Sequence, residues 1–157
     1  MLRAGPPGFF GLTDLFIVAM LVYDLATRRK VHPATIWGGL VPWNQVWRTG
    51  ANEATHFRTS RDLLFGETRV PAGSYTLWSV PGPEGWTIIF NRQTGQWGTV
   101  YDPAQDLARI PAQSRRTSGP PVEQLTLGIH PDECGAGGVL AIEWENTRVQ
   151  APFTVAP

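Results

Sequence analysis

Residues 74–91, SYTLWSVPGPEGWTIIFN, decide the fold class of this chain. Two runs rich in aromatic and β-branched residues flank the segment PGPEG, whose Pro and Gly content is typical of a turn. In the first run the side chains alternate, so that Tyr75 and Leu77 share one face while Trp78 lies on the other. This pattern predicts two antiparallel strands joined by a short connection.

The same period-two alternation recurs along the chain outside this stretch. It predicts further strands at residues 123–129, 139–146 and 149–153, and a tight hairpin at residues 63–70 about Gly66-Glu67. Apolar residues such as Leu140, Ile142 and Trp144 are expected to point inward, as are Leu125, Leu127 and Ile129. We therefore expect an all-β, antiparallel, β-sandwich-like domain.

Two short helical turns and one long loop complete the expected domain. Asp102 is a suitable N-cap and Pro103 suits the first helical position, so residues 103–108 are expected to be helical. Residues 42–46 are expected to form a second helical turn, and residues 111–121, PAQSRRTSGPP, a flexible loop.

Composition excludes several classes of partner and site. The chain has 157 residues, near the size of one domain, and its 13 Lys+Arg balance its 13 Asp+Glu. A formal net charge of zero argues against nucleic acid as the main partner, because phosphate binding needs an excess of basic residues. The single cysteine, Cys134, excludes an internal disulfide and a cysteine-rich zinc site. We predict no cofactor.

The apolar segment at residues 8–27 sets the N-terminal part of the chain apart. We divide the chain into residues 1–37, a hydrophobic helix with a basic juxtamembrane linker, and residues 38–157, a β-rich domain. A membrane-spanning helix is the favoured interpretation of the apolar segment, which reaches the length of a span only by including two Asp residues. A signal peptide and an amphipathic helix of a soluble protein remain as alternatives.

The segment at residues 47–57, WRTGANEATHF, carries the densest group of polar side chains with chemical potential. Arg48 is suited to bidentate binding of a carboxylate or phosphate, and Asn52 to an amide or hydroxyl. Glu53 and His56 would share a face if the segment were helical, but one Glu-x-x-His pair in a β-rich context does not predict a metal site. The alternative is structural, with Arg48 paired to a carboxylate such as Glu53.

The seven Trp residues divide into two groups. Three belong to predicted strands, where a core position is expected, whereas Trp37, Trp43, Trp47 and Trp97 fall in turn-like segments. These four form either part of the core or an exposed platform for a sugar or an apolar ligand. The ligand-binding residues that the sequence predicts, with Trp47 and Trp97 as walls, are Trp47, Arg48, Asn52, Glu53, Trp97 and Tyr101.

Several separated blocks agree in order with a known bacterial family. The sequence GGLVPWNQVWRTGANEATHF resembles the signature of domain of unknown function 2911. The resemblance covers roughly residues 38–155, in the blocks 38–57, 70–111, 122–129 and 140–155. It implies a β-rich domain of exported or envelope proteins and implies no established activity. Members of the family usually carry further β-forming sequence before the first block, where this chain has its apolar segment.

These observations together give a functional expectation. We expect an envelope-associated, membrane-associated β domain that acts as a non-catalytic small-ligand-binding or structural module. The alternative is a hydrolase or isomerase in which Glu53 or His56 is the general base. The expected partners are a small ligand, the membrane through the N-terminal helix, and a second copy of this chain, by self-association through a sheet edge that the absent strands would leave open.

Overall fold

The strands of this protein form where aromatic and β-branched residues alternate between short turns. The computed structural model describes residues 36–157, so the predicted helix at residues 8–27 lies outside the described part. In those residues the elements are β1 (Thr55–Thr59), β2 (Leu63–Phe65), β3 (Thr68–Val70), β4 (Gly73–Val80), β5 (Trp86–Asn91), the 3-10 turn η1 (Pro103–Gln105), β6 (Asp106–Arg116), β7 (Val122–Pro131), β8 (Gly137–Glu145) and β9 (Thr147–Val155).

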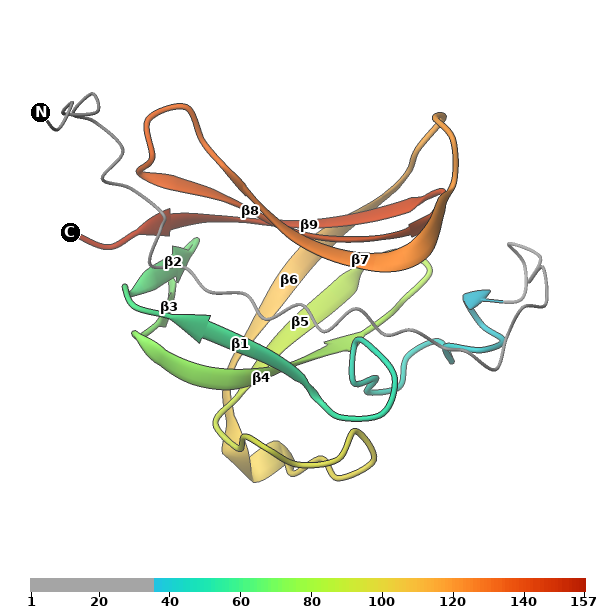
Figure 1. Cartoon of the computed structure of the whole chain (residues 1–157), viewed down its shortest axis with the longest axis horizontal. Helices are drawn as coiled ribbons and strands as arrows, with labels where there is room; N and C mark the ends of the chain where they lie inside the picture. The colour runs from blue at the N-terminus through green and yellow to red at the C-terminus, as the bar shows by residue number, and fades with distance from the viewer. Residues whose placement is uncertain (1–35) are drawn as a thin grey trace, which may run out of the picture.

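The strands are joined in one curled antiparallel sheet, open as a half-barrel (Figure 1). The path of paired strands runs β1-β4-β5-β6-β9-β2-β3, and β8 pairs with both β9 and β7. β6 makes the curl, because its first half pairs with β5 up to Ala112 and its second half pairs with β9 from Gln113 onward. The all-β, antiparallel prediction is confirmed, but the two halves are one continuous sheet rather than the separate sheets of a sandwich.

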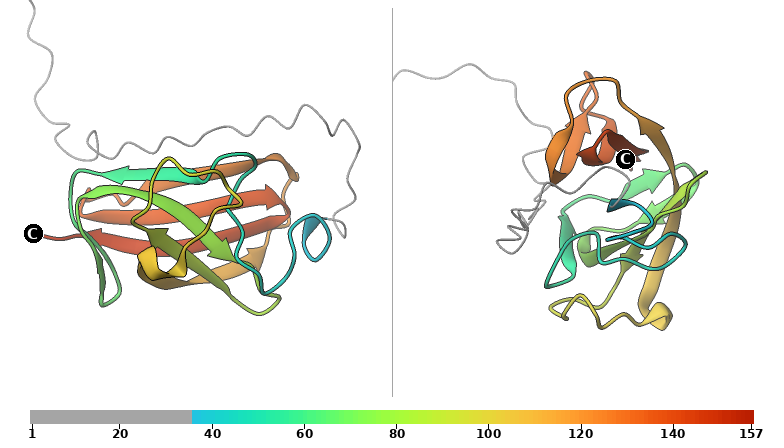
Figure 2. Two further views of the ribbon diagram at one scale, coloured as in Figure 1. Left: turned by 90° about the horizontal axis from the view of Figure 1, so that it is seen from below. Right: turned by 90° about the vertical axis from the view of Figure 1, so that its right-hand side faces the viewer.

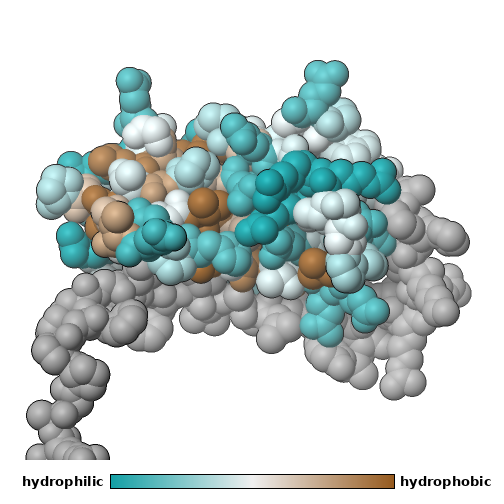
Figure 3. Space-filling view, turned by 90° about the horizontal axis from the view of Figure 1, so that it is seen from above, coloured by the Kyte–Doolittle hydropathy of each residue, from teal (hydrophilic) through white to brown (hydrophobic). Residues whose placement is uncertain are grey.

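Views from other sides show how the halves face each other (Figure 2). The half that contains β7, β8 and β9 lies over the half that contains β1, β4 and β5, and β6 runs between them. Figure 3 shows the outer face of the β7–β9 half, where hydrophilic side chains gather at one end and apolar surface at the other. On that half, Arg148 of β9 and Glu143 of β8 form a cross-strand ion pair at 3.2 Å between Nε and Oε1.

Large side chains from both halves meet inside the curl. The Phe90 ring of β5 lies 5.0 Å from the Phe57 ring, 5.3 Å from the Phe65 ring and 6.3 Å from the Tyr75 ring, measured between centroids. It therefore ties β5 to β1, β2 and β4. The fully buried residues that fill the same core include Leu63, Val70, Leu77, Ile88, Leu140, Ile142 and Val149.

β4 and β5 are buried on both faces. Leu77 and Ile88 point into the curl, whereas Trp78 and Ile89 form a second cluster on the outer face with Ala54. Two loops that follow Trp47 and Asn91 cover this outer face. The predicted assignment of alternate side chains of β4 to opposite faces is confirmed, and both faces are interior.

A cluster of five tryptophans closes one end of the half-barrel. The Trp37 ring lies between 5.0 and 6.4 Å from each of the other four rings, Trp43, Trp47, Trp86 and Trp144. The contacts of Trp37 with Trp47, Trp86 and Trp144 are nearly perpendicular, a favoured geometry for aromatic pairs, whereas the Trp43 ring is tilted by 31°. Three of the four tryptophans proposed for an exposed platform thus belong to this cluster, in which Trp47 is buried and Trp37 and Trp43 are partly buried, and Trp97 alone of that group is exposed.

Most of the predicted strands and turns are confirmed, and the structure differs from the prediction at residues 42–46, 106–108 and 111–116. The hairpin at Leu63–Val70 is confirmed, with Gly66 at φ 59°, where a type II′ turn needs a positive value. The helical turn at Asp102-Pro103 is also confirmed, but it ends at Gln105, and the expected loop at residues 111–121 is wrong because β6 continues to Arg116. Residues 42–46 form turns instead of a helix.

The predicted membrane helix is not tested by the described residues. Among residues 36–157, none of the helical segments has the length and apolar content that a membrane crossing requires.

We predict that Phe90→Ala lowers the free energy of unfolding by about 3–5 kcal/mol, because it removes a fully buried ring and leaves a cavity between four strands. Urea denaturation followed by Trp fluorescence measures this loss. Phe90→Leu, which keeps most of the volume, serves as the matched control and should cost much less. A loss below about 1 kcal/mol for the alanine variant would contradict the core packing described above.

Candidate functional site

Two loops on the outer face of β4 and β5 bring the predicted ligand-binding residues together. The first, the 47–54 loop, lies beside β4 through paired backbone hydrogen bonds between Trp47 and Ser79, at 2.8 and 2.9 Å. The second, the 92–101 loop, connects β5 to η1. The amide of Gly98 donates to the Asn52 carbonyl at 2.8 Å, and the amide of Ala54 donates to the Gln96 carbonyl at 3.3 Å. These bonds hold the two loops as one unit.

The 47–54 loop is held in a strained shape by buried hydrogen bonds. Thr49 and Asn52 have φ values of 52° and 65°, in the left-handed region that a β-branched residue such as Thr rarely adopts. The buried Thr49 hydroxyl lies 2.9 Å from the Ser79 hydroxyl, and the Thr49 carbonyl accepts from the Thr55 hydroxyl at 3.0 Å. Each such residue costs about 1–3 kcal/mol and persists only where its surroundings fix it.

Arg48 projects from this strained loop without a charge partner. Its side chain is half-buried, and its stem lies against Gly98, where an added Cβ would overlap with Arg48 Cδ and with the Asn52 carbonyl. The Arg48 Nε is buried and has no hydrogen-bond partner among the described residues. The expected structural pairing with Glu53 is not formed: the Glu53 side chain is exposed, and its backbone forms a bridge with Trp97.

The other predicted residues separate into exposed and interior groups. Trp97 is 52% exposed, and Val46 and Val100 add further exposed apolar surface. Asn52 and Glu53 are exposed as well. Trp47, in contrast, is buried, and its indole NH donates to the Gly50 carbonyl at 3.2 Å. Trp47 supports the loop from within the tryptophan cluster. Of the two tryptophans expected to line the ligand site, Trp97 alone is therefore exposed to a ligand.

A buried threonine supports the 92–101 loop from below. The Thr76 hydroxyl of β4 accepts from Trp78 Nε1 at 3.0 Å and from Gln96 Nε2 at 3.1 Å, and it donates to the Gln93 carbonyl at 2.8 Å. One hydroxyl therefore satisfies three polar groups that the sheet and the loop bury together. Alternation along β4 does not reveal this role, because Thr is equally common on exposed strand faces.

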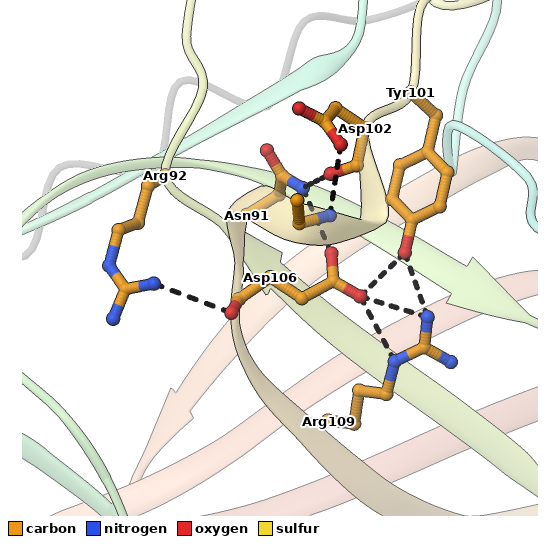
Figure 4. A network of polar contacts seen from close by, with 7 residues as sticks. Asn91, Arg92, Tyr101, Asp102, Asp106 and Arg109 are labelled. Atoms are coloured by element: carbon orange, nitrogen blue, oxygen red, sulfur yellow. Dashed lines mark hydrogen bonds and ion pairs between the residues drawn. The ribbon is translucent and has the colours of Figure 1, made fainter.

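Tyr101 belongs to a polar network with three residues that the sequence analysis did not identify (Figure 4). Its hydroxyl donates to Asp106 Oδ2 at 2.6 Å and accepts from the Arg109 guanidinium at 2.9 Å. Arg109 also donates Nε to Asp106 Oδ2 at 3.0 Å, and Asn91 Nδ2 donates to Asp106 Oδ1 at 2.9 Å. Both oxygens of Asp106 are thus used inside the protein.

This network fixes the return of the chain from the 92–101 loop into β6. The buried Asn91 amide also donates to the Asp102 carbonyl at 2.9 Å, and its own oxygen accepts from the Gln93 amide at 3.0 Å. Asn91 and Asp106 are register partners in β5 and β6, which the sequence could not show while β6 was taken for a helix and a loop. The Asp102-Pro103 cap was the one available signal for this turn.

The chemistry of Tyr101 follows from its surroundings. Burial, followed by the hydrogen bond to Asp106 and its negative charge, raises the pKa of Tyr101 to about 12. The phenol therefore stays protonated at neutral pH and acts as a donor to Asp106. Its ring packs against Trp78 at 4.9 Å between centroids, which places the network at the margin of the outer apolar cluster.

Glu53 and His56 do not meet on a helical face. His56 lies in β1, and Glu53 precedes it in extended chain, so the three-residue spacing does not bring the two side chains to one side. Neither side chain has a hydrogen-bond or ion-pair partner within residues 36–157. His56 lines a shallow hollow of about 210 Å³ with Phe57, Arg58 and Ser74. A search of residues 36–157 shows no group of three or more side chains that could hold a metal ion.

We predict that Gly98→Ala displaces the Arg48 side chain and loosens the contact between the two loops, because the new Cβ overlaps with Arg48 and Asn52. The variant should unfold at a measurably lower temperature in differential scanning calorimetry. Gly85→Ala is the matched control, since a Cβ there meets no atom within 4 Å. Equal melting temperatures for the two variants would show that Gly98 is not needed for close approach.

We predict that the Tyr101 phenol ionises near pH 12 in the folded protein, later than an ordinary tyrosine near pH 10. Because the folded pKa exceeds the unfolded one, this group stabilises the fold fully below pH 10, and the stabilisation is lost as pH rises towards 12. In an ultraviolet titration of tyrosinate, the ionisation step at the highest pH should be absent from the Tyr101→Phe variant. In the Asp106→Asn variant that step should occur at lower pH. A Tyr101 step near pH 10 in the unmodified protein would contradict the network.

Comparison with known proteins places the chain in a family. No curated protein and no solved structure shows a significant match to the chain. Residues 26–153 match the family described as protein of unknown function (DUF2911). The match takes in both loops and all the residues of the Tyr101 network, and it begins at residue 26 rather than at residue 38, where the resemblance in the sequence begins. The chain belongs to the DUF2911 family.

Proposed function

We propose that this domain is a non-catalytic, envelope-associated binding module that recognises a small ligand at the surface formed by Arg48, Asn52 and Trp97, here called the Arg48 surface. The ligand carries a carboxylate or phosphate beside a flat apolar group. The observation that carries the proposal is the Arg48 guanidinium, whose buried Nε has no partner among residues 36–157. The envelope location rests on the apolar segment at residues 8–27 and on the relatives that the family resemblance implies.

An unsatisfied buried donor favours an anionic ligand. A buried NH without an acceptor costs about 1–3 kcal/mol, and more when the group is charged. A carboxylate or phosphate can accept from two nitrogens of one guanidinium at once. Because Nε is covered by protein atoms, this bond requires the half-buried Arg48 side chain to turn when the ligand binds. The nearest acidic side chain in sequence, Glu53, is exposed and leaves Arg48 open to such a ligand.

The exposed ring of Trp97 supplies the apolar part of the surface. The Gly98 contact with Arg48 and the backbone bridge between Glu53 and Trp97 place the two side chains at the same junction of loops. A half-exposed indole can stack on a planar or sugar-like group, and Trp and Arg are the residues that most often dominate binding energy at interfaces. Asn52, also exposed, offers a neutral amide beside them.

The strained backbone supports a binding role over a purely structural one. Thr49, which directly follows Arg48, and Asn52, which belongs to the Arg48 surface, both have positive φ values. Such strain is concentrated at functional sites, where it holds side chains in a fixed arrangement before the ligand arrives. A loop that only covered Trp78 and Ile89 would not need this conformation.

The enzymatic alternative has less support. A general base is normally oriented by a second group within hydrogen-bond distance. Neither Glu53 nor His56 has such a partner among the described residues, and the residues that line the hollow beside His56 include none from the two loops.

We predict that a thermal-shift screen of aromatic and sugar carboxylates and phosphates finds a stabilising ligand, and that Arg48→Ala weakens its binding roughly 10- to 100-fold, because a hydrogen bond to a charged group contributes about 1.5–3 kcal/mol. Trp97→Ala should also weaken it. Arg116→Ala, which removes an exposed arginine at the far end of β6, is the matched control and should bind normally. Circular dichroism establishes that the variants are folded.

Two outcomes would refute the proposed surface. If a ligand raises the melting temperature of the folded Arg48→Ala variant as much as that of the unmodified protein, the ligand binds elsewhere. A ligand that is chemically changed during the assay, with the change abolished in Glu53→Gln or His56→Gln, would establish the enzymatic alternative.

A further inference from the structure

The large apolar side chains that remain exposed are concentrated near the Arg48 surface. Among residues 36–157 they are Leu40, Val46, Trp97 and Val100, which are between 38% and 58% exposed. Exposed apolar residues scattered singly over a protein need no explanation, but a group of them marks an interaction surface. Here they lie on two stretches of chain, residues 40–46 and 97–100, that lead into or belong to the two loops of the Arg48 surface.

Val46 lies on the same side of the chain as Arg48. The backbone bridge between Trp47 and Ser79 gives residues 46–48 the alternation of a strand. Trp47 points into the tryptophan cluster, so Val46 and Arg48 lie on the opposite side, over the outer face of β4. Figure 1 shows this part of the chain leading into the 47–54 loop on the side of the molecule away from β8 and β9.

Trp97 and Val100 form one turn beside Arg48. The amide of Val100 donates to the Trp97 carbonyl at 2.9 Å. Gly98, which follows Trp97, lies so close to the Arg48 side chain that an added Cβ would overlap with it. Val46, Trp97 and Val100 therefore border Arg48 with apolar surface and are here called the apolar rim.

The apolar rim lies in chain that carries almost no charge. Residues 36–47 and 93–101 contain no Asp, Glu, Lys, Arg or His, although 17% of the whole chain is charged. The 47–54 loop adds one basic and one acidic residue, Arg48 and Glu53. A surface with an exposed Trp, few charges and no net charge is suited to the interface between water and lipid, where tryptophan is enriched.

The sequence that precedes the domain brings a lipid partner within reach. The apolar segment at residues 8–27 ends nine residues before Ile36, and nine residues of chain span at most about 30 Å. A bilayer that holds this segment therefore lies within that distance of the folded domain. Residues 28–30 are Arg, Arg and Lys, which are attracted to the phosphates of lipid headgroups. A bilayer surface is thus the apolar partner that this chain itself brings to the rim.

We propose that the apolar rim docks on the surface of a phospholipid bilayer, with Arg48 binding a lipid phosphate. The side chains of the rim then enter the boundary between headgroups and acyl chains, and Arg48 lies at the depth of the headgroups. The inference rests on the anion site proposed at Arg48 and names a lipid headgroup as the source of its anion. Because Arg48 and Glu53 leave the surface without net charge, a zwitterionic lipid suffices.

Quenching by spin-labelled lipids tests this docking with the full chain in phosphatidylcholine vesicles. In a Cys134→Ser background, the single variants Val46→Cys, Val100→Cys and Thr126→Cys each carry one fluorophore. Thr126 is the matched control, because it is exposed on β7 between residues that pack against the core, and so lies on the outer face of the β7–β9 half. Circular dichroism establishes that each labelled variant is folded.

We predict that spin-labelled lipid lowers the fluorescence of the labels at Val46 and Val100 roughly twofold, because the side chains of a docked surface reach the acyl boundary. The label at Thr126 should keep its fluorescence. Adding Arg48→Ala should remove most of the quenching at Val46 and Val100, whereas adding Arg116→Ala should leave it unchanged.

Three results would overturn the proposal: a chain that does not sediment with the vesicles, equal quenching of all three labels, or quenching at the rim that Arg48→Ala does not change. A soluble carboxylate or phosphate that binds through Arg48 while neither rim label is quenched would overturn it as well, and would leave the small-ligand proposal standing. If Arg48→Ala changes neither the binding of soluble ligands nor the quenching, the Arg48 surface itself is wrong.

Discussion

Burial of β4 and β5 on both faces is the constraint on which the rest of the structure depends. The inner face contributes Leu77, Ile88 and Phe90 to the core of the half-barrel, and the outer face contributes Trp78 and Ile89 to a second apolar cluster. A curled sheet of this kind would normally expose its outer face to water. Here two loops must cover it, so the position of these loops is set by the need to exclude water from an indole and an isoleucine.

Covering the outer face also removes water from polar groups of the same strands. Thr76 and Asn91, register partners on β4 and β5, are both fully buried and must find partners inside the protein. Thr76 satisfies the 92–101 loop, and Asn91 satisfies the turn that leads into β6. Asp106, which accepts from Asn91, and Tyr101, which donates to Asp106, connect these buried polar groups to the protein surface. The polar network is thus a direct consequence of where the apolar cluster lies.

The sequence predicted those elements whose alternation is uninterrupted. β5 and the β2–β3 hairpin have the predicted bounds, and β8 and β9 differ only at their ends. β6 was missed because Pro111 and the polar run to Arg116 resemble a loop, although Pro111 lies on a strand with an exposed side chain. Of the predicted ligand-binding residues, Arg48, Asn52 and Trp97 lie at one junction of loops, and their role in binding stays a prediction. The roles of Asn91, Asp106 and Arg109 depend on a strand register that a sequence pattern does not contain.

The strain in the 47–54 loop is compatible with a stable domain because its cost is offset nearby. Thr49 is held by hydrogen bonds to Ser79 and Thr55, and Trp47 anchors the loop in the tryptophan cluster at the end of the barrel. The buried Nε of Arg48 has no hydrogen-bond partner among residues 36–157. The Nε of Arg48 thus stays unpaired although hydrogen bonds of Trp47 and Thr49 hold the loop on both sides of it, which agrees with the binding role proposed for this residue.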